Sequence, residues 1–500
     1  MFFNYDILNM VVEMKKNSIY YIFLFIIPIL IFLKFGISID NDFWFTIAEG
    51  KYVLKSGFPY YVPFTIYNGL DFVYQSWGTG VIFYLIYNFF GAYGIISFVT
   101  AIFLVIIYFY YKLCLLISNN NKVISLIITI LTMSFLSLGF ITTRPQIFTF
   151  LNLTLLLYFM ESYTKTNNKK YLIPLPLIAL FQINIHGMFF FMLLIFMIPY
   201  IINYIYLKIR SANSYRYSLK PIILTMILML LMGFINPYGI DNLLYVFNSY
   251  GQELLEKTII ELQPLSFATL NGKIFIFIII LIYILYFISP KIFSKKQLPI
   301  RYLLLLFGTT YLAFDTNRGG SLFLIASCFP LAYLYSDLIP DIDFENIFVS
   351  YHKTFKLITI FFVTILLATI FITPKNIYPD SREPIEFLLK NFDSKSVRLY
   401  TYFDDGSYAV YRGLKCSMDP RAEVFLKKNN HKSDIFKEYY NLQHNKLYYK
   451  DYLDKYNFTH LLINKKDSIY FDMKRDSYNY VLLKNFENYQ IYIRKDLLNK

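Results

Sequence analysis

Residues 19–44 read IYYIFLFIIPILIFLKFGISIDNDFW. The apolar part has the length of about 20 residues that a helix needs to cross the hydrocarbon core of a bilayer. No small-residue cleavage site follows it, so we expect a membrane anchor rather than a signal peptide. Two carboxylates, Asp40 and Asp42, come directly after the run. The stretch therefore predicts a membrane protein with acidic groups where the chain leaves the bilayer.

Apolar residues dominate the chain well beyond this first run. Of its 500 residues, 57% are hydrophobic, and the mean hydropathy of +0.46 exceeds that of ordinary soluble domains. Further runs lie at 93–117, 123–141, 145–160, 171–185, 188–206, 221–235, 273–289, 300–314, 320–337 and 354–373, with a shorter one at 78–90. We predict a polytopic α-helical domain over 19–374, with about 11–13 transmembrane or re-entrant helices.

The net charge of +14 is distributed as membrane topology requires and does not point to nucleic acid. Cytoplasmic loops are enriched in Lys and Arg. Thirteen such residues fall in alternate loops, at 112–122, 165–170, 208–220 and 291–301, and only four in the loops between them. We therefore expect the tail 1–18 in the cytoplasm, the chain in the cell membrane, and residues 375–500 on the extracytoplasmic side.

One part of this topology is open. If 38–77 lies outside and 112–122 inside, an odd number of crossings must separate them, yet two apolar runs lie between. The 78–90 run is about 20 Å long as a helix, which is short for a full span. Either that run is re-entrant, or the 112–122 loop breaks the charge rule.

Two external segments and a C-terminal domain complete the predicted organisation. In the first external loop, 38–77, residues 43–55 form an amphipathic helix that we expect to lie in the membrane interface. The second external segment, 240–270, is polar and acidic. Short β-like runs alternate with helical patterns over 375–500, which predicts a small extracytoplasmic α/β domain.

The order of the polar motifs is more specific than any one of them. They are Asp40-Asn-Asp-Phe-Trp44, Gly57-Phe-Pro59, Pro63-Phe-Thr65, Trp77, Arg144-Pro-Gln146, Asn184-Ile-His-Gly187, Asn236-Pro-Tyr-Gly239, Glu261-Leu-Gln-Pro264 and Asp419-Pro-Arg-Ala-Glu-Val424. Over about 38–425, this order resembles bacterial polytopic membrane proteins related to GT-C glycosyltransferases. The protein O-mannosyltransferase and aminoarabinose-transferase groups are among these relatives.

The resemblance implies a GT-C-like fold and a transferase. Its donor would be a sugar on a polyprenyl phosphate, its acceptor an extracytoplasmic hydroxyl, and its base a carboxylate of the first external loop, here Asp42 or Asp40. The chain departs from the family at Val62 and Ser76, where the family usually has acids. A non-catalytic member that binds lipid-linked glycan in envelope assembly is therefore the alternative, and a transporter is a weaker one.

Asp42 is the first candidate for the general base and Asp40 the second, because a base must take the proton from the acceptor hydroxyl. Asp also caps helices well, and a helix is expected to begin here, so an N-cap role for Asp42 competes with catalysis. The two carboxylates can also share a divalent cation. We predict no other metal site and no cofactor.

The substrate- and phosphate-binding candidates lie at the same outer ends of the apolar runs. They are Arg144, Gln146, Asn184, His186, Glu261 and Arg318. Arg suits bidentate contact with phosphate, although an Arg at a helix end also snorkels to the membrane surface. His186 and Glu261 also have roles that involve no substrate: His186 can be a structural histidine, and Glu261 can be a solvated charge in a loop. The sequence predicts an inverting GT-C-type glycosyltransferase with a lipid-linked donor and a glycan, lipid or protein acceptor.

Overall fold

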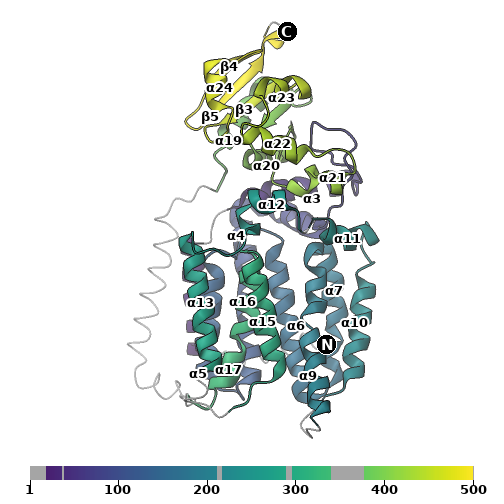
Figure 1. Cartoon of the computed structure of the whole chain (residues 1–500), viewed down its shortest axis with the longest axis vertical. Coiled ribbons are helices and arrows are strands. Elements are labelled where there is room, and N and C mark those ends of the chain that lie inside the picture. Colours follow the sequence, from purple (N-terminus) through teal and green to yellow (C-terminus); the bar gives the residue numbers. More distant parts are fainter. Residues whose placement is uncertain are drawn as a thin grey trace.

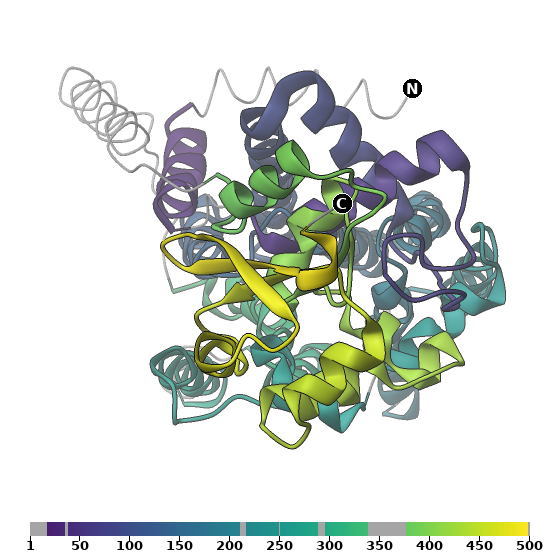
Figure 2. The same cartoon turned by 90° about the horizontal axis from the view of Figure 1, so that it is seen from above.

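Helices run side by side through the lower part of the molecule, and a mixed α/β part lies above one end of them (Figure 1). The computed structural model describes residues 18–35, 39–210, 217–249, 251–288, 296–338 and 377–498. The predicted run 354–373, the predicted boundary between 374 and 375, and nearly all of the predicted tail 1–18 lie outside the described residues. Seen from above, the C-terminal part lies over the bundle (Figure 2).

The bundle is built from the apolar runs. Its helices are α2 (Ser18–Phe35), α4 (Trp77–Ile117), α5 (Lys122–Ser137), α6 (Gln146–Thr166), α7 (Pro174–Ile185), α8 (Phe190–Ile195), α9 (Ile198–Ile209), α10 (Leu219–Met232), α13 (Leu270–Phe287), α15 (Ile300–Asp315), α16 (Gly319–Cys328) and α17 (Pro330–Tyr335). Among the described residues, three stretches are long and apolar enough to cross a membrane: Trp77–Ile117, Gly187–Ile209 and Leu270–Phe287. Shorter apolar helices accompany them.

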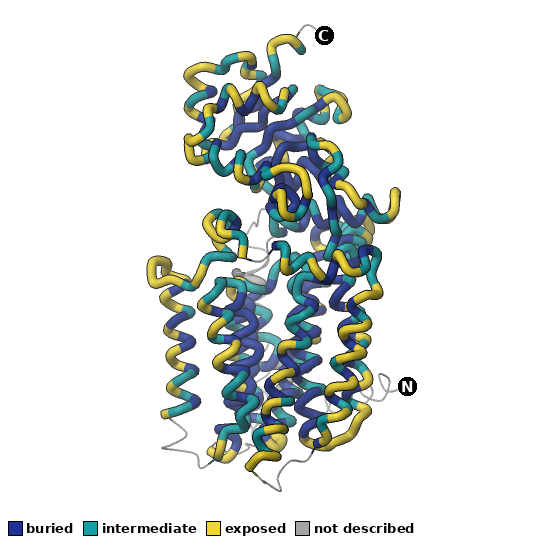
Figure 3. The backbone as a smooth tube through the Cα atoms, turned by 45° about the vertical axis from the view of Figure 1, so that its right-hand side comes forward, coloured by how far each residue is buried: buried dark blue, intermediate teal, exposed yellow. Residues whose placement is uncertain are grey.

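The outer faces of the bundle helices are apolar yet exposed, as the mixed colours along them indicate (Figure 3). Leu224 and Ile227 on α10 and Phe277 on α13 are each at least half exposed. Water does not favour so large an apolar surface, whereas lipid covers it without cost. The protein is therefore an integral membrane protein.

Helix α4 contains both runs, 78–90 and 93–117, that left the topology open. The helix is kinked at Gly91, whose φ of 63° is left-handed and whose ψ is −159°. The arm before the kink packs on α3 (Asn41–Ser56) so closely that a Cβ at Gly50 would lie 2.0 Å from the Gly80 carbonyl oxygen. An arm of this length is too short for a separate span. One crossing between 38–77 and 112–122 agrees with the distribution of loop charge.

The C-terminal part contains a five-stranded sheet within the range 375–500, where β-like runs were expected. Its strands are β1 (Arg398–Thr401), β2 (Lys415–Cys416), β3 (His460–Asn464), β4 (Tyr480–Asn485) and β5 (Tyr489–Arg494), in the order β2-β1-β3-β5-β4. Strand β1 is parallel to β2 and β3, and β5 is antiparallel to β3 and β4. All five residues of β3 are buried, as suits the central strand.

Helices pack around this sheet. They are α19 (Arg382–Asn391), α20 (Gly406–Tyr411), α21 (Lys427–Asn430), α22 (Ile435–Gln443), α23 (Tyr449–Tyr456) and α24 (Tyr470–Arg475). The first loop, between α3 and α4, joins the sheet edge: Ile66 N–H donates to the Cys416 carbonyl at 3.2 Å, and Cys416 N–H donates to the Phe64 carbonyl at 3.4 Å. The first loop and the C-terminal part are thus connected by main-chain hydrogen bonds.

Helix α3 forms where the amphipathic pattern predicted it, but protein covers its apolar face. Phe43, Trp44 and Ile47 are fully buried, and the Trp44 ring contacts Tyr408 and Tyr411 of α20. Protein rather than lipid therefore covers these residues, and a position of α3 in the membrane interface stays a prediction. The periodicity identified a buried face, but it could not tell whether lipid or the C-terminal part covers it.

Candidate functional site

The site begins at the first turn of α3, where the two carboxylates have different surroundings. Asp40 is the N-cap, and its Oδ1 accepts the Asp42 N–H at 2.9 Å. The Asp40 N–H donates to Thr143 Oγ1 at 3.1 Å. The capping role considered for Asp42 therefore falls to Asp40. Within the described residues the Asp42 carboxylate accepts no hydrogen bond, so its lone pairs are available for a proton.

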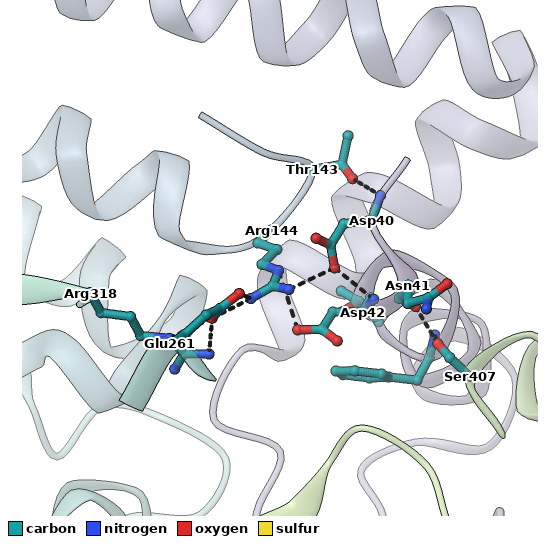
Figure 4. A network of polar contacts seen from close by, with 10 residues as sticks. Asp40, Asn41, Asp42, Thr143, Arg144, Glu261, Arg318 and Ser407 are labelled. Carbon is teal, nitrogen blue, oxygen red and sulfur yellow. Dashed lines mark hydrogen bonds and ion pairs between the residues drawn. The ribbon is translucent and has the colours of Figure 1, made fainter. Parts of the chain in front are cut away.

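Arg144 lies at the centre of three carboxylates (Figure 4). Its Nη2 is 2.9 Å from Asp40 Oδ1, and its Nε is 3.3 Å from Asp42 Oδ2. Its Nη1 donates to both oxygens of Glu261 at 2.7 Å. The guanidinium is held just before α6, since Pro145 follows it and α6 begins at Gln146.

Glu261 joins the two predicted phosphate-binding arginines. Arg318 Nη2 and Nε contact Glu261 Oε2 at 2.7 and 2.8 Å. Main-chain bonds hold the two segments together: Arg318 N–H donates to the Glu261 carbonyl at 3.2 Å, and Asn317 N–H donates to the Gln263 carbonyl at 2.9 Å. A carboxylate that bridges two guanidiniums occupies the position that a phosphate would favour.

Burial and neighbouring charges set the protonation of this cluster. Burial raises the pKa of Asp42 to about 7, and Asp40 and Glu261 add to that rise, while Arg144 opposes it. Burial also acts to raise the pKa of Glu261, but Arg318 and Arg144 outweigh it and hold that pKa below its ordinary value. Near neutral pH, Asp42 is therefore poised to exchange a proton while Glu261 stays charged.

A cavity of about 510 Å³ opens beside the cluster, between the bundle and the C-terminal part. Asp42, Arg144, Gln146, His186, Glu261 and Arg318 line it. Asn184 does not: its Oδ1 accepts the Trp77 Nε1–H at 2.9 Å, and its amide donates to the Ile235 carbonyl. Asp40 is likewise not among the lining residues. The structure thus brings six of the eight predicted residues to one cavity, and Asp40 and Asn184 are not part of its lining.

His186 reaches the cavity from a hydrogen-bonded position. Its Nδ1 lies 2.8 Å from Thr149 Oγ1, and Gln182 Nε2 donates to both Thr149 Oγ1 and the His186 carbonyl. These partners fix the ring and assign Nδ1 to a structural contact. The other ring nitrogen, Nε2, is the one that can meet a substrate.

A second buried ionic cluster, which the sequence did not predict, lies farther along α3. Arg421 Nη1 donates to Glu49 Oε1 at 2.9 Å, and its Nη2 donates to Asp419 Oδ2 at 2.6 Å. All three side chains are at least 95% buried. Burial raises the pKa of Glu49 to about 7, and Arg421 opposes that rise. Glu49 follows Asp42 by two helical turns, so helical periodicity alone places both on one face.

Asp404 is a further carboxylate that the sequence did not single out. It lines the cavity from the C-terminal part, and its side chain is exposed. Within the described residues it forms no hydrogen bond or ion pair, whereas the neighbouring Asp405 accepts from Asn464 and Tyr489. In the sequence, a carboxylate in a solvated turn cannot be told from one that lines a cavity. The difference arises only when the C-terminal part packs on the bundle.

A divalent cation shared by Asp40 and Asp42 was one alternative from the sequence, and in the structure both carboxylates contact a guanidinium. Asp40 and Asp42 both meet Arg144, which supplies the positive charge between them. Among the described residues, no group of three or more His, Cys, Asp or Glu side chains has a metal-binding arrangement. A divalent cation at Asp40 and Asp42 stays an untested alternative.

Solved structures with a similar architecture are known. The chain is similar to the oligosaccharyltransferase of Archaeoglobus fulgidus tethered to an acceptor peptide with the NVT sequon, with a TM-score of 0.55 and 12% identity over 90% of this chain and 70% of that one. The apo form of that enzyme gives a TM-score of 0.53 at 12% identity, with the same coverage. The archaeal oligosaccharyltransferase AglB from Archaeoglobus fulgidus, in complex with an inhibitory peptide and a dolichol-phosphate, gives 0.51 at 13% identity over 92% and 70%.

These structures have the GT-C fold, so the fold of this chain is the one that the motif order suggested. No family model and no curated protein sequence matches the chain. At this identity the likeness concerns the fold, and the chemistry has to be argued from the residues of this chain.

Proposed function

We propose that the protein is a glycosyltransferase that moves a sugar from a polyprenyl-phosphate-linked donor to an extracytoplasmic acceptor, with inversion. Asp42 is the general base. One observation carries the proposal: a single cavity combines Asp42, whose pKa is raised to about 7, with Arg144 and Arg318. Base and phosphate-binding cations are the two groups that such a transfer requires from the protein.

In this mechanism the donor phosphate binds at Arg318 and Arg144 and competes there with Glu261. Asp42 takes the proton of the acceptor hydroxyl as the oxygen attacks the anomeric carbon. The bond from that carbon to the phosphate oxygen breaks, and the arginines stabilise the departing phosphate. Attack on the face opposite the leaving group inverts the anomeric configuration, because the step involves a single displacement.

The placement in the cell follows from the same proposal. We propose a bacterial protein of the cytoplasmic membrane with about 11–13 transmembrane or re-entrant helices and an extracytoplasmic C-terminal domain. One similar archaeal structure is tethered to an acceptor peptide, and another holds an inhibitory peptide and a dolichol-phosphate. The dolichol-phosphate is consistent with a lipid-linked donor here, and the acceptor can be protein, glycan or lipid.

A non-catalytic protein that binds lipid-linked glycan is the second candidate. It is favoured by the ion pairs of both arginines with carboxylates, which balance the arginine charges without a bound phosphate. Against it stand the cavity and the Asp42 carboxylate that accepts no hydrogen bond within the described residues.

The deciding experiment uses purified full-length protein in vesicles with a radiolabelled polyprenyl-phosphate sugar and extracytoplasmic membrane extract as acceptor. The enzyme hypothesis expects transfer of label by the wild type and transfer at least about 100-fold slower by Asp42→Asn. Binding of donor by the wild type without any transfer would overturn it and support the non-catalytic alternative.

Arg318→Ala tests the phosphate contact. We expect the donor KM to rise about 10- to 100-fold, because one charge-assisted contact of roughly 1.5–3 kcal/mol is lost. Arg382→Ala is the control, since Arg382 lies on α19 away from the cavity lining. A donor KM that stays unchanged in Arg318→Ala would remove Arg318 from the phosphate site.

The pH dependence tests the base. Asp42 is surrounded by Asp40, Arg144, Glu261 and Arg318, and its pKa is raised to about 7. A base works only when deprotonated, so kcat/KM should rise about tenfold per pH unit below that pKa and level off above it. The measurement is initial transfer rate from about pH 5 to about pH 8 at subsaturating donor. A flat profile over this range would contradict the assignment.

A further inference from the structure

The C-terminal part reaches into the first turn of α3 through one hydroxyl group. Ser407 lies in α20 and is buried. Its Oγ accepts the Phe45 N–H at 3.0 Å and donates to the Asn41 carbonyl oxygen. Figure 4 shows this contact beside the carboxylate cluster. The two partners are separated from Ser407 by more than 350 positions in the sequence.

These two main-chain groups belong to the first turn of α3. The N–H of residue 45 and the C=O of residue 41 are four positions apart, which is the α-helical hydrogen-bond spacing, and α3 begins at Asn41. The Ser407 hydroxyl contacts both groups from the C-terminal part. Ser407 therefore acts as a clamp on the turn that contains Asp42.

The rest of that turn is equally well defined. The Asp42 N–H donates to Asp40 Oδ1, and its carbonyl accepts from Thr46 Oγ1 at 2.7 Å. Within the C-terminal part, Gly406 lets the start of α20 pack against the Met418 segment, since a Cβ there would lie 1.9 Å from the Met418 carbonyl oxygen. The main-chain groups on both sides of Asp42 are thus hydrogen-bonded, and Ser407 supplies two of these contacts from the C-terminal part.

We propose that Ser407 is a positioning residue that sets where the Asp42 carboxylate stands relative to Arg144 and the cavity. This inference rests on the function proposed above. It makes the C-terminal part a component of the active site, because the turn that presents the base is completed from more than 350 residues away. Without the hydroxyl, the C-terminal part no longer holds the two main-chain groups that flank Asp42, and the carboxylate loses its fixed position.

Two substitutions of equal bulk test the hydroxyl separately from packing. Ser407→Thr keeps the hydroxyl, and Ser407→Val has the same shape without it. We expect Ser407→Val to lower kcat about 10- to 100-fold relative to Ser407→Thr, as a displacement of about 1 Å does, with a donor KM within about twofold. Ser417→Ala is the control: Ser417 is also buried in the C-terminal part, but its hydroxyl accepts from Thr401 N–H instead.

Hydrogen exchange provides a second measurement that needs no activity. The amide of Phe45 should exchange at a different rate in Ser407→Val than in Ser407→Thr, while the amides near Ser56 stay unchanged. Equal kcat in the two variants, or equal exchange at Phe45, would overturn the proposal. A wild type without transferase activity would instead defeat the proposed function, and the exchange comparison would still decide whether Ser407 sets the turn.

Discussion

Asp42→Asn should lower kcat/KM for sugar transfer by about 10²- to 10⁴-fold, the range that a positioned general base contributes. The substitution keeps the size of the side chain and removes only its ability to take a proton. The fold should tolerate it, because burial makes the charged form of Asp42 costly in the folded state. The measurement is steady-state transfer by the purified full-length protein, with a thermal midpoint to verify folding.

Asp40→Asn is the matched control for this prediction. Asn caps helices as well as Asp does, so the hydrogen bond from the Asp42 N–H is retained. Arg144 keeps its contacts with Asp42 and Glu261. We expect a loss of less than about tenfold, since no proton transfer is removed. A larger loss in Asp40→Asn than in Asp42→Asn would exchange the two roles.

Arg421→Gln should be the most destabilising of the substitutions considered. Arg421 is the guanidinium between the buried carboxylates of Glu49 and Asp419. Removing one partner of a buried ion pair typically costs about 3–5 kcal/mol, because the remaining charge is left unpaired. The expected result is a large fall in the thermal midpoint in detergent micelles and loss of transfer, since α3 and the C-terminal part separate at this contact.

Arg412→Gln is the matched control for the second prediction. Arg412 pairs with Glu386, and both side chains are more than a third exposed. Exposed ion pairs are worth about 0–1 kcal/mol, so this variant should fold almost as the wild type does. The triple variant Glu49→Gln, Asp419→Asn, Arg421→Gln removes all the charges and should recover part of the stability. Equal loss in Arg421→Gln and Arg412→Gln would show that the buried cluster does not hold the two parts together.

Much of the site was accessible from the sequence because its residues sit at the ends of apolar runs. Run length and loop charge predict that Asp42, Arg144, Glu261 and Arg318 lie on one side of the membrane before any contact is known. Residues at the same ends of neighbouring helices lie close together in a packed bundle. Their side chains can therefore be expected to meet at one cavity. Asn184 also lies at the end of an apolar run, yet its side chain accepts a hydrogen bond from Trp77. A helix end has more than one face, and the sequence does not show which of them lines the cavity.

The contribution of the C-terminal part was not accessible in this way. Most of its strands were predicted from short β-like runs, but no pattern in the sequence assigned a role to Arg421, Asp404 or Ser407. Their importance comes from contacts with α3 or with the cavity. The apolar face of α3 shows the same limit, since burial against protein and burial in lipid produce the same periodicity.

The sequence by itself determined that the chain is a membrane protein with its carboxylates, arginines and C-terminal domain expected on one side. It could do so because hydrophobic length and loop charge act locally, within one helix or one loop. Only the tertiary structure decided that Asp40 caps the helix while the Asp42 carboxylate faces the cavity. Only the tertiary structure put a serine and an arginine of the C-terminal part against that helix. Such contacts join segments hundreds of residues apart, and no local pattern records which surfaces will meet when the chain folds.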